Sequence, residues 1–288
     1  MTIVKILAPI TGASRDSVVL STAFAMAKPF NAHVEALFVH PDPRESVPIT
    51  ELPMSPTIIQ ELVDTAEEMK KNAAKAAKAT LADTADKADA KIIAAPEKSN
   101  AVTVSYREVV GHLPDCVEEA AKLSDLIVFP PLVHADSTEA HDAFVHVLTK
   151  SERAVLLCAE TPPKSIGTKI AIGWDGGLAA AHALTATIPF LKKAWKVELL
   201  EVGHFPAGHQ RVREAREYLA LHDVEISVSA IERGQRAIGE VLLEAATNDG
   251  CDLLVVGGYG HSRLRESIFG GVTAHLASHP KIPILMVH

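Results

Sequence analysis

An internal repeat constrains the fold of this chain more than any other feature of its 288 residues. Three apolar segments of the first half recur in the second half, in the same order. The recurring pairs are 5–13 with 169–177, 33–39 with 196–202, and 125–129 with 252–256. The first two pairs are offset by 164 and 163 residues and the third by 127, so the first copy is longer. The repeat therefore predicts two tandem copies of one folding unit.

Each copy alternates apolar, strand-like runs with segments of helical periodicity. Runs such as 253–256, which show no polar alternation, are typical of parallel strands that are covered on both faces. This alternation predicts an α/β fold with two tandem open doubly wound parallel sheets of five strands each. We expect domains at 1–160 and 169–288, joined by a proline-containing linker at 161–168.

The extra length of the first copy lies in a proline-rich loop at 41–56 and a helix at about 57–90. The apolar residues of this helix form one stripe at helical spacing, namely Ile59, Leu62, Val63, Ala66, Met69 and Ala73. Its lysines, Lys70, Lys71, Lys75 and Lys78, are expected to form a solvated face. The loop is expected to be a surface excursion, with a lid over a pocket as the alternative.

The composition argues against several classes of protein. A net charge of −8 without any basic block does not favour binding to nucleic acid or to an anionic membrane. No apolar run approaches the roughly 18–20 residues that span a bilayer, and the first residues lack the pattern of a signal peptide. The three cysteines, Cys116, Cys158 and Cys251, are far apart, so we expect buried thiols in a cytoplasmic protein.

A glycine-rich stretch in the second copy carries the clearest functional signal. The strand-like run 253–256 leads into a turn at 257–260, and a second glycine pair, Gly270 and Gly271, opens a helix. Glycine lets backbone N–H groups approach an anion, and the N-terminus of a helix adds a partial positive charge. The stretch therefore predicts a phosphate-binding turn, with a tight turn that binds no ligand as the alternative.

Other motifs for nucleotide binding, catalysis or metal binding do not match. The dinucleotide fingerprint follows the first strand of its unit, whereas Gly258 and Gly260 follow the fourth. The chain has no Gly-Lys-Ser/Thr loop and no Gly-x-Ser-x-Gly nucleophile motif. The closest histidine pairs, His141 with His146 and His204 with His209, lie outside any carboxylate-rich or cysteine-rich setting, so we expect no metal site.

The spacing Gly257-x2-Gly260-x9-Gly270, between an apolar strand and a helix, resembles that of the universal stress protein family. The ending Trp174-Asp175-Gly176 of the second copy's first strand adds to the likeness. The resemblance covers the whole chain as two tandem family domains, more strongly in the second half. It implies that the last strands, at 154–158 and 282–287, pair to form an intramolecular pseudo-dimer. Such pairing would protect two exposed strand edges.

Many members of this family bind ATP, and the resemblance implies an adenine-nucleotide site in the second copy. The residues it implies are Gly173, Asp175, Val202, Val256, Gly257, Tyr259, Gly260, Gly270, Gly271 and Val272. Asp175 would accept hydrogen bonds from the ribose, Val202 would contact adenine through its backbone, and the glycines would line the phosphates. The alternatives are a helix cap for Asp175 and an exposed loop aromatic for Tyr259. Gly271 replaces the usual Ser or Thr of the family, which leaves ATP, ADP and AMP as candidates.

The first copy departs from the family pattern. Thr11 stands where the second copy has its aspartate, and Pro130-Pro131 replaces the glycine turn. Proline has no N–H to offer a phosphate. No glycine pair precedes the apolar segment 144–148. We therefore expect no nucleotide site of the family type in the first copy.

Together these features predict a cytoplasmic universal stress protein that binds ATP, ADP or AMP, with or without Mg²⁺, in a stress-response or regulatory role. The alternative is a nucleotide-free protein of the same fold that binds a partner or a small ligand. We assign no catalytic residue. Slow ATP hydrolysis would need a base, for which His261 is the nearest candidate. A further homodimer and an unknown protein partner stay open, and no nucleic-acid or membrane partner is expected.

Overall fold

A computed structural model describes residues 2–42, 55–132, 138–161, 165–203, 208–258, 271–278 and 280–288. The first half contains β1 (Lys5–Ile10), α1 (Asp16–Ala27), β2 (His33–His40), α2 (Pro56–Ala88), β3 (Lys91–Ile92), β4 (Thr103–Val110), α3 (Leu113–Ala121), β5 (Leu126–Phe129), α4 (Thr138–His146) and β6 (Ala154–Leu157). The second half contains β7 (Lys169–Gly173), α5 (Leu178–Leu191), β8 (Lys196–Val202), α6 (Gly208–Ala220), β9 (Ser227–Ile231), α7 (Ile238–Asn248), β10 (Leu253–Gly257), α8 (Gly271–Ser278) and β11 (Ile284–Val287). A 3-10 turn, Lys28–Phe30, follows α1, and a π-helical turn, Val147–Ser151, follows α4.

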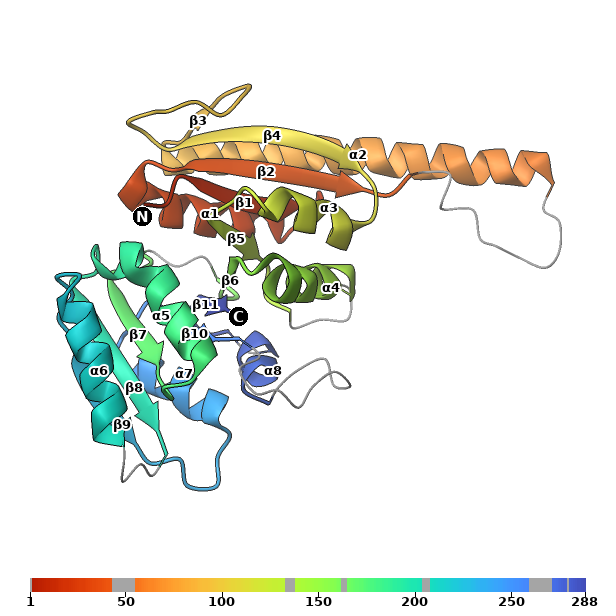
Figure 1. Ribbon diagram of the computed structural model, residues 1–288. Coiled ribbons are helices and arrows are strands. Elements are labelled where there is room, and N and C mark those ends of the chain that lie inside the picture. The colour runs from red at the N-terminus through yellow and green to blue at the C-terminus, as the bar shows by residue number, and fades with distance from the viewer. Residues whose placement is uncertain are drawn as a thin grey trace.

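The strands form one continuous sheet, in which the two halves lie side by side (Figure 1). Its order is β3-β4-β2-β1-β5-β6-β11-β10-β7-β8-β9. Neighbouring strands are parallel within each half, whereas β6 and β11 pair antiparallel, with Leu156 opposite Leu285. The expected contact between the segments 154–158 and 282–287 is therefore present as a strand ladder. This ladder joins the two predicted sheets into a single one.

Helices cover both faces of the sheet, as the doubly wound prediction requires. One hydrophobic cluster packs α1, α2, α5 and α6 against one face, through residues such as Leu20, Leu81, Leu184 and Leu219. A second cluster packs α3, α4, α7 and α8 against the other face, through residues such as Val117, Phe144, Leu242 and Leu276. Corresponding helices of the two halves thus cover the same face, because the antiparallel pairing of β6 with β11 relates the halves by an approximate two-fold rotation.

Each half has one point where the strand order reverses. In the first half β1 lies between β2 and β5, and in the second half β7 lies between β8 and β10. Open α/β sheets bind ligands outside the carboxyl ends of the strands at such a point. The ends of β7 and β10 are therefore the part of the second half where a ligand site is expected.

The structure departs from the sequence-based prediction mainly in the first half. This half has six described strands rather than five, since the two-residue strand β3 pairs with β4 at the outer edge of the sheet. The helix expected around 144–148 begins earlier, at Thr138, and the helix expected at about 57–90 spans Pro56–Ala88. Cys158 and Cys251 are buried as expected, but Cys116 is only partly buried. No described helix has both the length and the apolar character needed to cross a membrane.

The long helix α2 extends well beyond the sheet that it covers. Its buried residues all lie in the C-terminal part, and they are Ala77, Leu81, Thr84 and Ala85. The N-terminal part projects past the ends of β2 and β4 as a free-standing rod (Figure 1). Ser55 caps this end, where its hydroxyl accepts a hydrogen bond of 3.4 Å from the N–H of Ile58.

Candidate functional site

The carboxyl ends of β7 and β10 form the candidate site, and glycine ends both strands. A Cβ atom at Gly173 would lie 3.1 Å from a Cγ atom of Val256, which is tighter than an ordinary contact. A Cβ atom at Gly257 would lie 2.6 Å from backbone atoms of Ala179 and Ala180 at the start of α5. Only glycine therefore lets β10 approach α5 this closely. At both strand ends the space beside the glycine is therefore filled by the chain itself, by Val256 and Leu242 at Gly173 and by the start of α5 at Gly257.

Asp175 follows β7, and its carboxylate folds back onto the chain. Its Oδ1 accepts a hydrogen bond of 2.7 Å from the N–H of Gly177, the residue that precedes α5. The intervening Gly176 has a φ of +72°, a left-handed conformation that favours glycine. Arg211, on α6, donates a 3.0 Å hydrogen bond from Nη1 to the carbonyl oxygen of Asp175. The carboxylate of Asp175 thus closes the turn that leads into α5, whose N-cap residue is Gly177 and has no side-chain cap.

The remaining predicted site residues are placed only in part. Val202 ends β8, the strand next to β7, and is buried. Gly271 and Val272 begin α8, where the carbonyl oxygen of Val272 lies 3.0 Å from the position of a Cβ atom at Gly239 on α7. Val256 and Gly257 lie in β10. Tyr259, Gly260 and Gly270 lie outside the described residues, as does His261, so their contacts stay predictions.

Trp174 is a residue of this region to which the sequence assigned no role. It lies between Gly173 and Asp175, and its backbone N–H donates to Leu200 at 2.9 Å. Its indole Nε1 is buried, and no hydrogen-bond acceptor for it lies in the described part of the chain. A buried indole N–H normally finds an acceptor, so this donor is an unsatisfied group beside the candidate site.

The corresponding turn of the first half is filled by a side chain of the protein itself. The carboxylate of Asp16 accepts hydrogen bonds from the N–H groups of Thr11 (3.0 Å) and Gly12 (2.7 Å). Asp16 is only 3% exposed, and burial raises its pKa even though both N–H groups act to lower it. The N–H groups of the turn after β1 are therefore already bound by a carboxyl group, supplied from the first turn of α1.

The proline pair of the first half also makes an internal contact. Arg15 donates a 3.0 Å hydrogen bond from Nη1 to the carbonyl oxygen of Pro131. Beside this contact a cavity of about 280 Å³ remains at the carboxyl ends of the first-half strands. It is lined by Thr11, Val39, His40, Pro41, Gly111, His112, Leu113 and Glu139. The first half thus has a small pocket at its strand ends, and the residues that line it differ from those of the candidate site in the second half.

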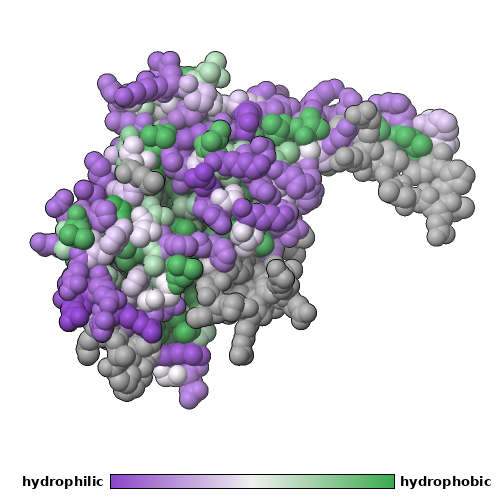
Figure 2. All heavy atoms as spheres, in the orientation of Figure 1, coloured by the Kyte–Doolittle hydropathy of each residue, from purple (hydrophilic) through white to green (hydrophobic). Residues whose placement is uncertain are grey.

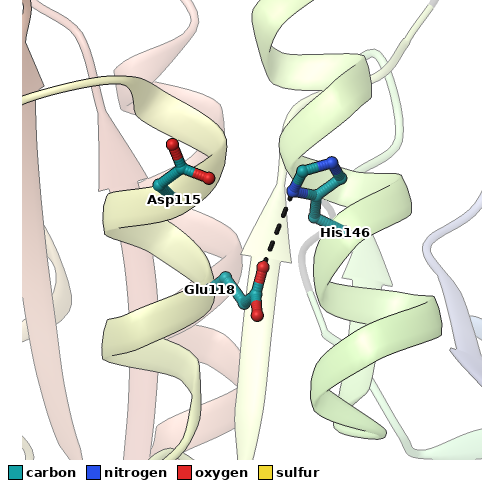
Figure 3. Close-up of side chains that lie close together, drawn as sticks. All are labelled: Asp115, Glu118 and His146. Carbon is teal, nitrogen blue, oxygen red and sulfur yellow. Dashed lines mark ion pairs between the residues drawn. The ribbon is translucent and has the colours of Figure 1, made fainter.

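One described cluster has donor groups of the kind that bind metals. Asp115 and Glu118 on α3 face His146 on α4, and their ligand atoms all lie within 4.8 Å of one another (Figure 3). Glu118 is 3.6 Å from Nδ1 of His146 and 3.9 Å from the ammonium group of Lys150. These contacts link α3 to α4 and to the π-helical turn that follows it, and Lys150 supplies positive charge near the carboxylate of Glu118.

Comparisons with known proteins give a consistent picture of the fold. Residues 169–288 match the model of the Universal stress protein family. A universal stress protein from Archaeoglobus fulgidus DSM 4304 is 15% identical, with a TM-score of 0.65, and the match covers 98% of this chain and 95% of that chain. A protein of unknown function from Pseudomonas aeruginosa PAO1 is 16% identical, with a TM-score of 0.55, and 99% of this chain and 92% of that chain are covered.

A third structure, of a universal stress protein in complex with cAMP, is 26% identical but matches only 42% of this chain and 96% of its own, with a TM-score of 0.35. The search of curated proteins found no match. The likeness to the universal stress protein family thus rests on the match of residues 169–288 to the family model. The chain as a whole has the tandem α/β fold seen in the longer solved structures.

Proposed function

We propose that the second half binds an adenine nucleotide and that the chain acts as a nucleotide-responsive regulatory protein. The observation that carries this proposal is the geometry at the reversal of strand order. There the neighbouring strands β7 and β10 both end in glycine, and Asp175 follows the end of β7. The carboxyl ends of parallel strands at such a reversal are where open α/β sheets receive ligands.

Each proposed site residue has a distinct role. Asp175 accepts hydrogen bonds from the ribose hydroxyls, and Val202 contacts the adenine through its backbone. Val256, Gly257, Tyr259 and Gly260 follow the ribose and the phosphates. Gly270, Gly271 and Val272 supply backbone N–H groups at the start of α8. Because Gly271 has no hydroxyl, the site is expected to discriminate weakly between ATP, ADP and AMP.

Two features of the described residues fit such a ligand. The unsatisfied indole N–H of Trp174 lies at the strand end that would face the nucleoside. The bond from Asp175 to the N–H of Gly177 fixes the carboxylate at the mouth of the turn, although a ribose would have to share this acceptor. Mg²⁺ would accompany the phosphates where ATP or ADP is the ligand. We assign no catalytic role to the chain.

The proposal gives the two domains different roles. The domain at 169–288 binds the nucleotide, the domain at 1–160 does not, and residues 161–168 link them. The first domain pairs with the second through β6 and keeps its own turn occupied by Asp16. We place the protein in the cytoplasm. A nucleotide-free role for the same fold is the second candidate, and the first-half cavity of about 280 Å³ is the observation that favours it.

Ligand analysis and calorimetry test the proposal directly. Mass spectrometry of small molecules released from the purified protein should detect an adenine nucleotide, and titration with ATP, ADP and AMP should show binding in the micromolar range. Gly260→Val should abolish binding, because a branched side chain would occupy the phosphate turn. Asp175→Ala should weaken it by about tenfold, the value of roughly one charge-assisted hydrogen bond.

Thr11→Ala is the matched control, since Thr11 holds the equivalent position in the first half and should leave binding unchanged. The proposal fails if no adenine nucleotide binds below millimolar concentration. It also fails if Gly260→Val binds as the unchanged protein does.

A further inference from the structure

Six charged residues form a single stripe along α2, and their signs are divided into two blocks. The spacing along the chain is 3, 4, 3, 4 and 3 residues, which places all six on one face of the helix. In order, the stripe consists of Glu61, Asp64, Glu68, Lys71, Lys75 and Lys78. All six residues are exposed. The helix therefore carries an acidic half and a basic half on the same exposed face, the basic half bordering β4.

The arrangement is antisymmetric about a point between Met69 and Lys70. The members of each acid–base pair have residue numbers that add to 139, and the pairs are Glu61 with Lys78, Asp64 with Lys75, and Glu68 with Lys71. An antiparallel copy of the same helix, related by a two-fold axis at this point, would set every acid of one copy opposite a lysine of the other. A two-fold interface requires self-complementarity of this kind.

The stripe is largely unused within the chain. In the part of the chain that the structure describes, Glu61, Glu68 and Lys75 have no ion-pair partner. Lys71 lies 3.8 Å from Glu67 on the same helix, and Lys78 lies 3.9 Å from Glu108 on β4. Pairs between exposed residues of this type contribute little to the stability of a single chain. The stripe is therefore available to a second molecule.

The shape of this region also suits a second helix. A groove of about 1070 Å³ runs beside α2, and Lys71, Lys75 and Lys78 line it together with Glu108 and Val110 of β4. The acidic half of α2 projects beyond the body of the protein, and Figure 2 shows mainly hydrophilic side chains along it, interrupted by apolar ones. A projecting helix with no buried residue before Ala77 is marginal in water on its own.

From these observations we propose that two copies of the chain associate through antiparallel contact of their α2 helices. The acidic half of each helix lies along the basic half of the other, beside the groove. The interface is confined to one helical face and its charges are exposed, so the dimer is weak and sensitive to salt. This proposal is independent of nucleotide binding, because α2 belongs to the first half.

Charge reversal with complementary rescue tests the pairing. The acidic variant carries Lys71→Glu and Lys75→Glu, and the basic variant carries Asp64→Lys and Glu68→Lys. In a homodimer of either variant, four of the six facing pairs would have like charges. In a mixed dimer all six would have opposite charges. Lys78 is left unchanged because it also lies 4.8 Å from the centre of the Tyr106 ring.

Sedimentation velocity of the full chain is the measurement, at about 300 µM protein and about 20 mM salt, where screening is weak. The unchanged protein should dimerise and should dissociate as salt is raised. Each variant alone should show a dissociation constant at least about tenfold higher, because like charges oppose association. An equimolar mixture should form the dimer again. Lys98→Glu with Lys281→Glu, which changes the net charge as the acidic variant does but at exposed sites elsewhere, should behave as the unchanged protein does.

Spin labels then test the register. In the proposed dimer the two labels at position 61 and the two at position 78 are each separated by about 26 Å along the helix axis, since the rise is 1.5 Å per residue. Labels at position 68 are separated by only about 5 Å along the axis. A monomer under these conditions, a dimer that charge reversal does not weaken, or a mixture that stays monomeric would overturn the proposal.

Discussion

The turns after β1 and β7 have the same backbone but different contents. Gly12 and Gly176 lie 164 residues apart, and both have a left-handed φ, of +83° and +72°. In each half the helix after the second strand crosses directly over this glycine. A Cβ atom at Gly12 would lie 2.4 Å from the carbonyl oxygen of Ala73 on α2, and one at Gly176 would lie 2.4 Å from Cδ of Arg211 on α6.

The two turns differ in the side chain that follows the glycine at the start of the next helix. In the first half the carboxylate of Asp16 binds the N–H groups of the turn. The residue at the same offset in the second half is Ala180, which has no polar group to offer. The two turns thus keep similar backbone at the left-handed glycine but differ in the carboxylate that binds their N–H groups, Asp16 from the helix in the first half and Asp175 from the turn itself in the second.

Replacing each of the two glycines by alanine should give the largest loss of stability and the clearest difference between the two turns. Gly12→Ala should destabilise the protein by about 3 kcal/mol or more, since left-handed strain adds to a clash with backbone that has no room to move. Gly176→Ala should cost about 2 kcal/mol, because the flexible side chain of Arg211 can swing aside at the loss of its bond to Asp175. Urea unfolding monitored by circular dichroism measures both values.

Gly250→Ala is the control for strain alone, because Gly250 has a φ of +68° and no atom of the described residues outside its chain neighbours lies within 4 Å of its added Cβ. It should cost about 1 kcal/mol. An equal loss of unfolding free energy at Gly12 and Gly176 would contradict the claim that a clash with the backbone of α2 costs more than a clash with the flexible side chain of Arg211.

Removing the internal carboxylate should have the next largest effect. Asp16→Ala leaves two N–H groups without an acceptor in a largely buried turn, which should cost about 2–3 kcal/mol. Asp175→Ala removes one bond from an exposed turn and should cost under about 1 kcal/mol. Urea unfolding measures both costs. If the two variants have the same dependence of unfolding free energy on urea, their midpoints give the difference in stability. A larger cost at Asp175 would show that the second turn, rather than the first, depends on its carboxylate for stability.

Adding a carboxylate to the second turn is the reverse of removing Asp16 from the first. Ala180→Asp would place a carboxylate at the offset that Asp16 occupies in the first half. If the second turn is an open version of the first, this variant should stay folded and should bind nucleotide at least about tenfold more weakly, because like charges repel. If calorimetry shows that Ala180→Asp binds nucleotide as the unchanged protein does, the second turn is not an open version of the first.

A buried glutamate that occurs at the same position of both halves gives a smaller, pH-dependent effect. Glu35 lies 3.0 Å from Lys5 and 2.7 Å from Arg107, and its counterpart Glu198 accepts a 2.5 Å hydrogen bond from Ser229 and lies 3.7 Å from Lys196. Burial by itself would raise the pKa of Glu198, but the Ser229 hydroxyl and the nearby lysines outweigh it and lower the pKa.

Since the folded-state pKa of Glu198 is lowered, its contribution to stability is present above the unfolded pKa and is lost as the pH falls through the folded value. Glu198→Gln should therefore cost about 1–2 kcal/mol at neutral pH, and the difference from the unchanged protein should shrink below about pH 4. Unfolding curves at both pH values test this, with Glu225→Gln as the exposed control. A constant difference across this range would contradict the assignment.

The sequence predicted the strands well because most are continuous apolar runs, as in Leu253–Gly257. It missed β3 because Lys91 and Ile92 are both exposed and carry no pattern. It also missed the role of Asp16, although an aspartate shortly after a glycine turn, at the start of a helix, was a signal that could have been used. The split of the charges along α2 was visible in the sequence, but only the structure shows that this half of the helix extends beyond the body.

The ladder between β6 and β11 has a consequence for the order in which the protein is made. β11 follows β6 by about 127 residues, yet it occupies the centre of the finished sheet. At a translation rate of about 5–20 residues per second, the apolar edge of β6 stays unpaired for roughly 6–25 seconds after the first half emerges. During this interval the nascent first half exposes an unpaired apolar strand edge, which is a site for association with other chains.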